Sequence, residues 1–198
     1  IYGQLKPEQV PVSEDTPLRP VNPYGVSKAA VDLMAYQYFK AYNLPVYWVR
    51  AFSHAGPGQR TVAVLSDWAF QTARIELGIS IPEIKVGNLE ITRDYTDVRD
   101  TVQAYVALIE KGNPGQPYNA CSGNGYRLSE LLDIIVSFSS KKIKIIPDPS
   151  RLRPVDIPVL IGSPEKLKKD TGWQPKIKIE QTLKDIYEYW INYLTPQI

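Results

Sequence analysis

The sequence predicts an α/β fold built on a parallel sheet, and two neighbouring segments carry that prediction. Residues 24–42 have apolar side chains at helical spacing, and Pro23 stands where a helix would start. Residues 45–52 are almost continuously apolar up to Arg50, which is typical of a buried strand. A helix that leads through a short connection into such a strand is one step of a parallel α/β sheet.

The rest of the chain continues the alternation of helix and strand. Residues 4–22 are Pro-rich and without periodicity, so we expect a loop there, and 53–60 is expected to be a Gly/Pro loop. Further helices are expected at 62–77, 96–111, 129–138, 163–172 and 179–194, and further strands at 81–86, 118–121 and 142–146.

Three further expectations concern individual residues. In the helix over 96–111, the residues expected to face inward are Val98, Val102, Tyr105, Val106 and Ile109. The four Trp and Cys121 are expected to be packing residues. Gly123-Asn124-Gly125 has Leu128 where a phosphate-binding loop would need a third Gly, so it is interpreted as a turn.

Composition limits the classes of function. With 43% apolar and 22% charged residues, the 198-residue chain is an ordinary globular sequence of one or two small domains. The net charge of +2 provides no electrostatic case for nucleic acid or an anionic membrane, and no apolar run reaches the roughly 18 residues that span a bilayer. One Cys and one His exclude an internal disulfide and a Cys/His zinc cluster, so we expect no metal and a reducing, cytoplasmic setting.

Tyr24 and Lys28 are the candidate catalytic residues. Their spacing places them on one face of the predicted helix, and a nearby ammonium favours the ionised form of a phenol. A phenol in that setting can exchange a proton with a substrate oxygen near neutral pH. Spacing alone would favour a surface Tyr beside a solvated Lys, since the chain has 13 Tyr and the pair Tyr36 and Lys40 repeats the interval. The Pro before Tyr24 and the motifs around it favour the catalytic interpretation.

Five stretches, in order and across most of the chain, resemble the extended short-chain dehydrogenase/reductase family of nucleotide-sugar epimerases, dehydratases and reductases. They are Pro23-Tyr-Gly-Val-Ser-Lys28, Arg50-Ala-Phe-Ser-His-Ala-Gly-Pro-Gly-Gln59, Val86-Gly-Asn-Leu-Glu90, Arg93-Asp-Tyr-Thr-Asp-Val-Arg-Asp100 and Arg151-Leu-Arg-Pro-Val-Asp156. The resemblance implies the C-terminal part of a Rossmann-type parallel sheet with helices, plus a smaller α/β substrate-binding lobe. Residues 1–60, with about 86–111 returning to it, would belong to the dinucleotide-binding domain, and 61–198 mainly to the sugar-nucleotide lobe.

The same resemblance implies a part of the family's fold that this sequence does not contain. No Gly-x-Gly-x-x-Gly phosphate loop occurs, and Ile1-Tyr2-Gly3 looks like the end of the strand that carries the family's catalytic Ser or Thr. We therefore expect that Ser or Thr to lie before Ile1, together with an N-terminal Rossmann half.

The function implied by the resemblance is NAD(P)H-dependent reduction of a nucleotide-linked 4-keto-6-deoxy sugar, with GDP-4-keto-6-deoxy-D-mannose reduced to GDP-D-rhamnose as the specific reaction. Tyr24 would donate the proton, and Lys28 would hold the nicotinamide ribose. The implied contacts to NADP, or NAD, are Tyr24, Lys28, Phe52, His54 and Gln59. The implied contacts to the GDP-linked substrate are Ser53, Val86, Asn88, Arg93, Arg153 and Asp156, although Ser53 replaces the family's usual Asn. For each Arg, a solvated or salt-bridged side chain is the plain alternative.

Two alternatives stay open at this point. One is a GDP-mannose 4,6-dehydratase or another epimerase or dehydratase, because the acidic residue that distinguishes them would lie before Ile1. The other is a catalytically inactive fragment that only binds sugar nucleotide. In either case the family implies a homodimer that pairs through the helix over 24–42 and its neighbour.

Overall fold

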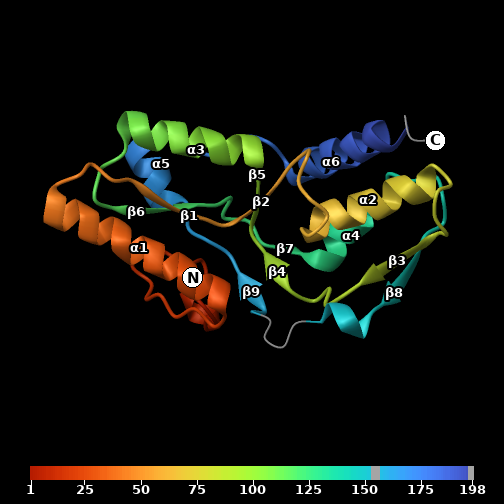
Figure 1. Cartoon of the computed structure of the whole chain (residues 1–198), viewed down its shortest axis with the longest axis horizontal. Coiled ribbons are helices and arrows are strands. Elements are labelled where there is room, and N and C mark those ends of the chain that lie inside the picture. The colour runs from red at the N-terminus through yellow and green to blue at the C-terminus, as the bar shows by residue number, and fades with distance from the viewer. Residues whose placement is uncertain (153–156, 196–198) are drawn as a thin grey trace. The chain divides into compact units, whose positions relative to one another are not determined.

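Residues 1–152 and 157–195 are described by a computed structural model, in which the chain forms two compact units (Figure 1). The first unit comprises residues 1–54, 92–125 and 157–176. The second comprises residues 55–91, 126–152 and 177–195. Each unit is therefore assembled from three separate stretches of chain.

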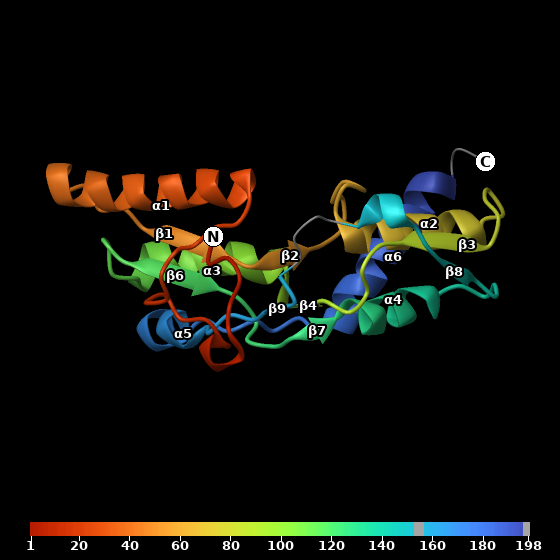
Figure 2. The ribbon, with the colours of Figure 1, turned by 90° about the horizontal axis from the view of Figure 1, so that it is seen from below.

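The first unit is built on two parallel strands, β1 (Trp48–Ala51) and β6 (Pro117–Ala120), which pair from Trp48 opposite Pro117 to Ala51 opposite Ala120. Helix α1 (Pro23–Tyr42) lies on one side of this pair, and α3 (Val98–Lys111) and α5 (Glu165–Thr171) lie on the other (Figures 1 and 2). This is the α/β class with parallel strands that the sequence predicts.

Two hydrophobic clusters fill the first unit. One cluster packs α3, α5 and β6 together, and its buried residues are Ala104, Leu108, Tyr118, Ala120, Leu167 and Trp173. The other joins the N-terminal segment to the end of β1, through Tyr2, Val12, Phe52 and Cys121. The N-terminal segment, which contains the 3₁₀ turn η1 (Pro7–Gln9), is thus a packed part of the unit, although its sequence reads only as a loop.

Several very short strands were not predicted from the sequence. Strand β2 (Ser53–Ala55) pairs with β5 (Tyr95–Asp97), and β4 (Thr92–Arg93) pairs in parallel with β9 (Val159–Leu160). The helix expected from residue 96 therefore begins two residues later. Asp97 accepts a hydrogen bond from the Arg99 N–H at 2.8 Å and so caps α3.

The inward face predicted for α3 is wrong. Val98 is half-buried. The other four predicted residues are exposed, with 71% of Ile109 accessible, and they are Val102, Tyr105, Val106 and Ile109. The buried face instead carries small or polar side chains, namely Asp100, Thr101 and Ala104, together with Leu108. The Asp100 carboxylate accepts a hydrogen bond from the Lys176 N–H, and the Asp100 carbonyl accepts one from the Trp173 indole, so this face is hydrogen-bonded to the segment at 173–176.

The second unit consists of three helices and a strand pair. Helix α2 (Val64–Glu76) packs against α6 (Ile179–Leu194) and α4 (Leu128–Val136), and β3 (Glu83–Val86) pairs in parallel with β8 (Lys144–Pro147). Two further short elements are β7 (Tyr126–Arg127) and η2 (Pro149–Arg151). Its least exposed large side chains are Leu65, Trp68, Ile84, Leu131, Leu132, Ile135, Leu183 and Ile186.

Two properties of the described residues bear on function. None of the described helices has both the length and the apolar character that crossing a membrane requires. Within residues 1–152 and 157–195, no three His, Cys, Asp or Glu side chains group so that they could hold a metal ion.

Candidate active site

The start of α1 presents Tyr24 and Lys28. Asn22 caps the helix by accepting a hydrogen bond from the Gly25 N–H at 2.8 Å, and Pro23 occupies the first helical position. A Cβ on Gly25 would lie 2.9 Å from Pro20 Cβ, so the backbone of the first turn packs tightly on the preceding segment. The first turn is therefore anchored by its cap and by this contact, and it holds Tyr24 at a defined position.

Tyr24 and Lys28 lie side by side. The Lys28 ammonium is 5.5 Å from the centre of the Tyr24 ring, within the range of a cation–π contact, and 72% of Tyr24 is exposed. Lys40 and Tyr36 repeat the arrangement at 5.7 Å. The local geometry of the two pairs is the same, so the surroundings at the capped helix start, and not the pair itself, distinguish Tyr24.

The candidate cofactor contacts after β1 divide between the two units. Phe52 is buried, and its N–H donates to the Ala120 carbonyl at 2.9 Å. The next residue, Ser53, is a candidate substrate contact and is half-buried. The candidate cofactor contact His54 is exposed, with its Nδ1 3.1 Å from the Phe52 carbonyl oxygen. Gln59 belongs to the second unit, where its carbonyl accepts a hydrogen bond from the Ser66 hydroxyl.

Two candidate substrate residues lie together in the second unit. Val86 ends β3 and is buried, and the half-buried Asn88 accepts a hydrogen bond from the Glu90 N–H through its side chain. A Cβ on Gly87 would lie 2.8 Å from the Arg151 carbonyl oxygen, so the 86–88 segment runs against the segment at 151. The sequence places these two stretches 63 positions apart, between Asn88 and Arg151, yet the fold makes them neighbours.

Four further candidate substrate residues are Ser53, Arg93, Arg153 and Asp156, of which Ser53 and Arg93 lie in the first unit. Arg93 lies in the first unit, on β4, where its guanidinium donates to the Thr92 carbonyl at 2.8 Å. Arg153 and Asp156 lie outside the described residues.

A buried polar network that was not predicted from the sequence joins α1 to β1. The Arg50 guanidinium on β1 binds both carboxylate oxygens of Asp32 on α1, at 2.7 and 2.9 Å. Burial disfavours the charge of Arg50, but the hydrogen bonds to Asp32 and Tyr2 outweigh that cost and raise the pKa of Arg50. The only sequence signals for this pair are an acidic residue four positions after Lys28 and an Arg that ends an apolar run.

A second missed residue is Asp94, whose side chain is almost completely buried. It accepts hydrogen bonds from the N–H groups of Ser122, Gly123 and Gly162 and from the Ser122 hydroxyl. Burial raises the pKa of Asp94, and these four hydrogen bonds oppose that shift. Asp94 thus joins the loop after β6 to the loop after β9, directly beside Arg93.

Comparison with known proteins shows the family of the chain. The sequence matches the profile of the GDP-mannose 4,6 dehydratase family over residues 1–186, and the chain belongs to that family. Its structural neighbours are Rossmann-type proteins with parallel sheets. Solved relatives include RMD from Pseudomonas aeruginosa complexed with NADPH, which is 33% identical with a TM-score of 0.92 over 97% of this chain and 64% of that chain.

Two further relatives show the breadth of the family. GDP-6-deoxy-D-mannose reductase of Pseudomonas aeruginosa is 34% identical over 96% of this chain and 62% of that protein. The UDP-glucose 4-epimerase of Thermotoga maritima, solved with UDP-glucose, is 26% identical with a TM-score of 0.87, over 98% of this chain and 60% of that one. The chain thus spans under two thirds of the length of these relatives.

Proposed function

We propose that this protein reduces a nucleotide-linked 4-keto-6-deoxy sugar with NAD(P)H, and specifically GDP-4-keto-6-deoxy-D-mannose to GDP-D-rhamnose. The observation that carries the proposal is the Tyr24–Lys28 pair at the capped start of α1, with the ammonium 5.5 Å from the ring centre, in a member of this family. The similarity to a GDP-6-deoxy-D-mannose reductase supports the reductase over other reactions of the family.

The reaction divides between cofactor and protein. The nicotinamide, when bound, supplies a hydride to the carbonyl carbon of the sugar. Negative charge then builds on the carbonyl oxygen, and the Tyr24 hydroxyl donates its proton there, which gives the alcohol. The ammonium of Lys28 stabilises the resulting phenolate until solvent restores the proton.

The exposed side chains fit a nicotinamide cofactor. Tyr24 and Lys28 are both open to solvent on α1, and the three N–H donors of an ammonium suit the hydroxyls of a ribose. Phe52, His54 and Gln59 are the other proposed cofactor contacts. NADP is preferred over NAD because a relative with a TM-score of 0.92 was solved with NADPH.

The GDP-linked substrate would be held at its guanosine, its diphosphate and its sugar. Val86 and Asn88 would contact the guanosine, and the guanidinium groups of Arg93 and Arg153 would bind the diphosphate, because a planar guanidinium matches phosphate oxygens. Asp156 would take ribose hydroxyls, and Ser53 would offer the sugar one donor where the family's usual Asn offers two.

A dehydratase or epimerase is the second candidate, since a GDP-mannose 4,6 dehydratase of Arabidopsis thaliana is 27% identical over 93% of this chain and 48% of that protein. The third candidate is a protein that binds sugar nucleotide without turnover. The absence of a Gly-x-Gly-x-x-Gly loop from the sequence favours the third for the 198-residue polypeptide alone.

The proposed assembly is a cytoplasmic homodimer that pairs through α1 and its neighbour. Helix α1 exposes large apolar side chains, among them Leu33 at 65% and Met34 at 55%. Exposed apolar faces of this kind mark surfaces that another protein surface covers.

Two measurements on the purified protein separate the candidates. The intact mass shows whether the active species is the 22.4 kDa chain, and NADPH oxidation with GDP-4-keto-6-deoxymannose shows whether it is a reductase. Turnover supports the reductase, and conversion of GDP-mannose to its 4-keto-6-deoxy form supports the dehydratase. Binding of GDP-mannose without either reaction at a mass of 22.4 kDa supports the binding protein.

A further inference from the structure

Helix α1 carries the proposed catalytic pair but buries little of itself. Its buried residues are Gly25 in the first turn and Asp32 in the middle, while Leu33 and Met34 beside Asp32 are exposed. Most helices in globular proteins are held by an apolar face. At the middle of α1, the described contacts with the rest of the unit include the carboxylate of Asp32.

That carboxylate makes a two-point contact. Asp32 Oδ2 accepts from Arg50 Nε at 2.7 Å and Oδ1 accepts from Nη2 at 2.9 Å, and each side chain is only 9% exposed. A bidentate pair of this kind fixes orientation as well as distance, because both groups are planar. It therefore restrains rotation of α1 about its own axis more than a single hydrogen bond would.

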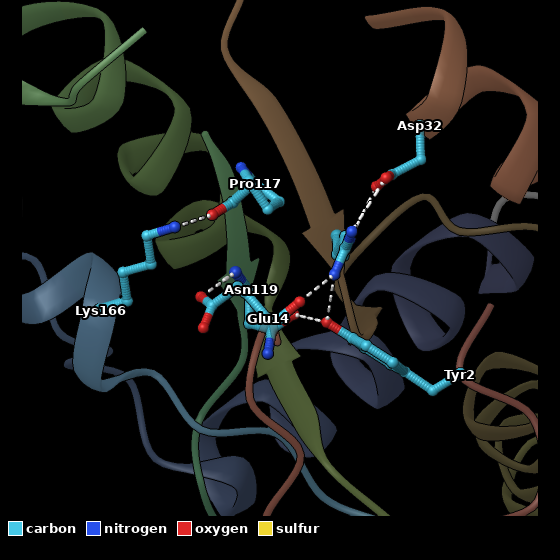
Figure 3. A network of polar contacts seen from close by, with 7 residues as sticks. Tyr2, Glu14, Asp32, Pro117, Asn119 and Lys166 are labelled. Carbon is cyan, nitrogen blue, oxygen red and sulfur yellow. Dashed lines mark hydrogen bonds and ion pairs between the residues drawn. The ribbon is translucent and has the colours of Figure 1, made fainter. Parts of the chain in front are cut away.

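The remaining nitrogen of the Arg50 guanidinium makes two further hydrogen bonds. Its Nη1 donates to the Glu14 carbonyl at 2.8 Å and to the Tyr2 hydroxyl at 3.1 Å. The Tyr2 hydroxyl donates to Asn119 Oδ1 on β6 at 2.6 Å. Asp32, Glu14 and Tyr2 therefore share one hydrogen-bonding partner, and Figure 3 shows the three residues around it. The guanidinium thus links α1 to β6 and to the segment before α1.

Asp32 lies one helical turn beyond Lys28 and two turns beyond Tyr24. We infer that Asp32 and Arg50 are positioning residues, which set the rotation of α1 and with it the direction in which Tyr24 and Lys28 face the reacting oxygen. The catalytic part of this inference rests on the proposed function. A role in stability alone is a weaker account, because a buried ion pair contributes little net stability compared with apolar residues of similar volume.

The test compares variants in the purified protein. Asp32→Asn removes the charge, and Arg50→Lys keeps a charge but loses the fork that binds both oxygens. Asp32→Glu retains the carboxylate, which keeps the test informative if Asp32→Asn folds poorly. The matched control is Asp67→Asn, which removes another 2.7 Å pair with an Arg, Arg151, in the second unit.

Two readouts do not require activity. We expect amide hydrogen exchange in α1 to accelerate by roughly tenfold in Asp32→Asn, the effect of losing a hydrogen bond to a charged group, and exchange elsewhere in the first unit to change less. A 3-fluorotyrosine at position 24 should shift its ¹⁹F resonance in Asp32→Asn and Arg50→Lys but not in Asp67→Asn. Unchanged exchange in α1 and an unchanged resonance would overturn the inference.

The third readout is kinetic. In NADPH oxidation, Asp32→Asn should lower kcat by about 100-fold with little change in KM, the loss expected when a reacting group moves by roughly 1 Å. Asp32→Glu should recover part of kcat. If Asp32→Asn has the same kcat as Asp67→Asn, the inference is wrong. If the wild type itself shows no turnover, the proposed function fails. In that case, hydrogen exchange and the ¹⁹F resonance still decide whether Asp32 and Arg50 orient α1.

Discussion

At the scale of single residues, the proposed chemistry depends on the Tyr24 hydroxyl. Tyr24→Phe removes that one oxygen and keeps the ring beside Lys28. Because the side chain is 72% exposed, the change should leave the free energy of unfolding almost unaltered. We expect kcat for NADPH oxidation to fall by about 10²–10⁴-fold, the usual contribution of a general acid.

The matched control for Tyr24→Phe is Tyr36→Phe, which removes the hydroxyl of the second Tyr–Lys pair on the same helix. It should retain wild-type kcat. Equal losses in the two variants would show that the phenol at the helix start has no special role.

Cys121 should be chemically inert in the folded protein. It is fully buried, and this burial, together with the charges of Asp94 and Glu14, raises the pKa of its thiol. Since the thiolate is the reactive form, we expect the native protein to resist iodoacetamide and the denatured protein to take up one label. Rapid native labelling, followed by intact mass, would contradict the packing around β6.

At the scale of elements, the cap of α1 offers a direct test. Asn22→Ala removes the acceptor for the Gly25 N–H and should lower the free energy of unfolding by about 1 kcal/mol. Urea denaturation measures this change, and Asn22→Asp, which retains an acceptor, should restore most of it. If Asn22→Ala unfolds at the wild-type urea concentration, the cap does not stabilise the start of α1.

The helices and the longer strands could be predicted from the sequence because their signals are local. Pro23 and the apolar spacing after it predict α1, and the continuous apolar run predicts β1. Strands of two or three residues such as β4 and β9 could not be predicted, because so short a pairing is determined by which segments the tertiary fold brings together.

The buried face of α3 shows a second limit of sequence patterns. Apolar spacing identifies a stripe of side chains but not the surface that will cover it. On α3 the stripe that includes Val102 and Ile109 faces outward in this chain, while Ala104 and Leu108 pack inward.

The candidate site was predictable in part. The Tyr24–Lys28 pair follows from spacing and context within one helix. Asp32–Arg50 and the hydrogen bonds of Asp94 could not be predicted, because each joins residues that are far apart in sequence and no periodic pattern links them.

At the scale of the whole molecule, the exposed apolar side chains of α1 predict self-association. Light scattering after size exclusion should give twice the mass of one chain. Leu33→Glu places a charge on the exposed face of α1 and should shift the protein to monomer without unfolding it, while Val62→Glu, at a site 91% exposed outside that helix, should leave the dimer intact. A monomeric wild type would refute the proposed assembly.

The most direct test of the central claim is NADPH oxidation by the purified protein in the presence of GDP-4-keto-6-deoxymannose. We predict that oxidation requires the sugar nucleotide, yields GDP-D-rhamnose and is lost in Tyr24→Phe. A protein that binds NADPH and the sugar nucleotide but oxidises no NADPH, or a Tyr24→Phe variant with wild-type kcat, would contradict the account.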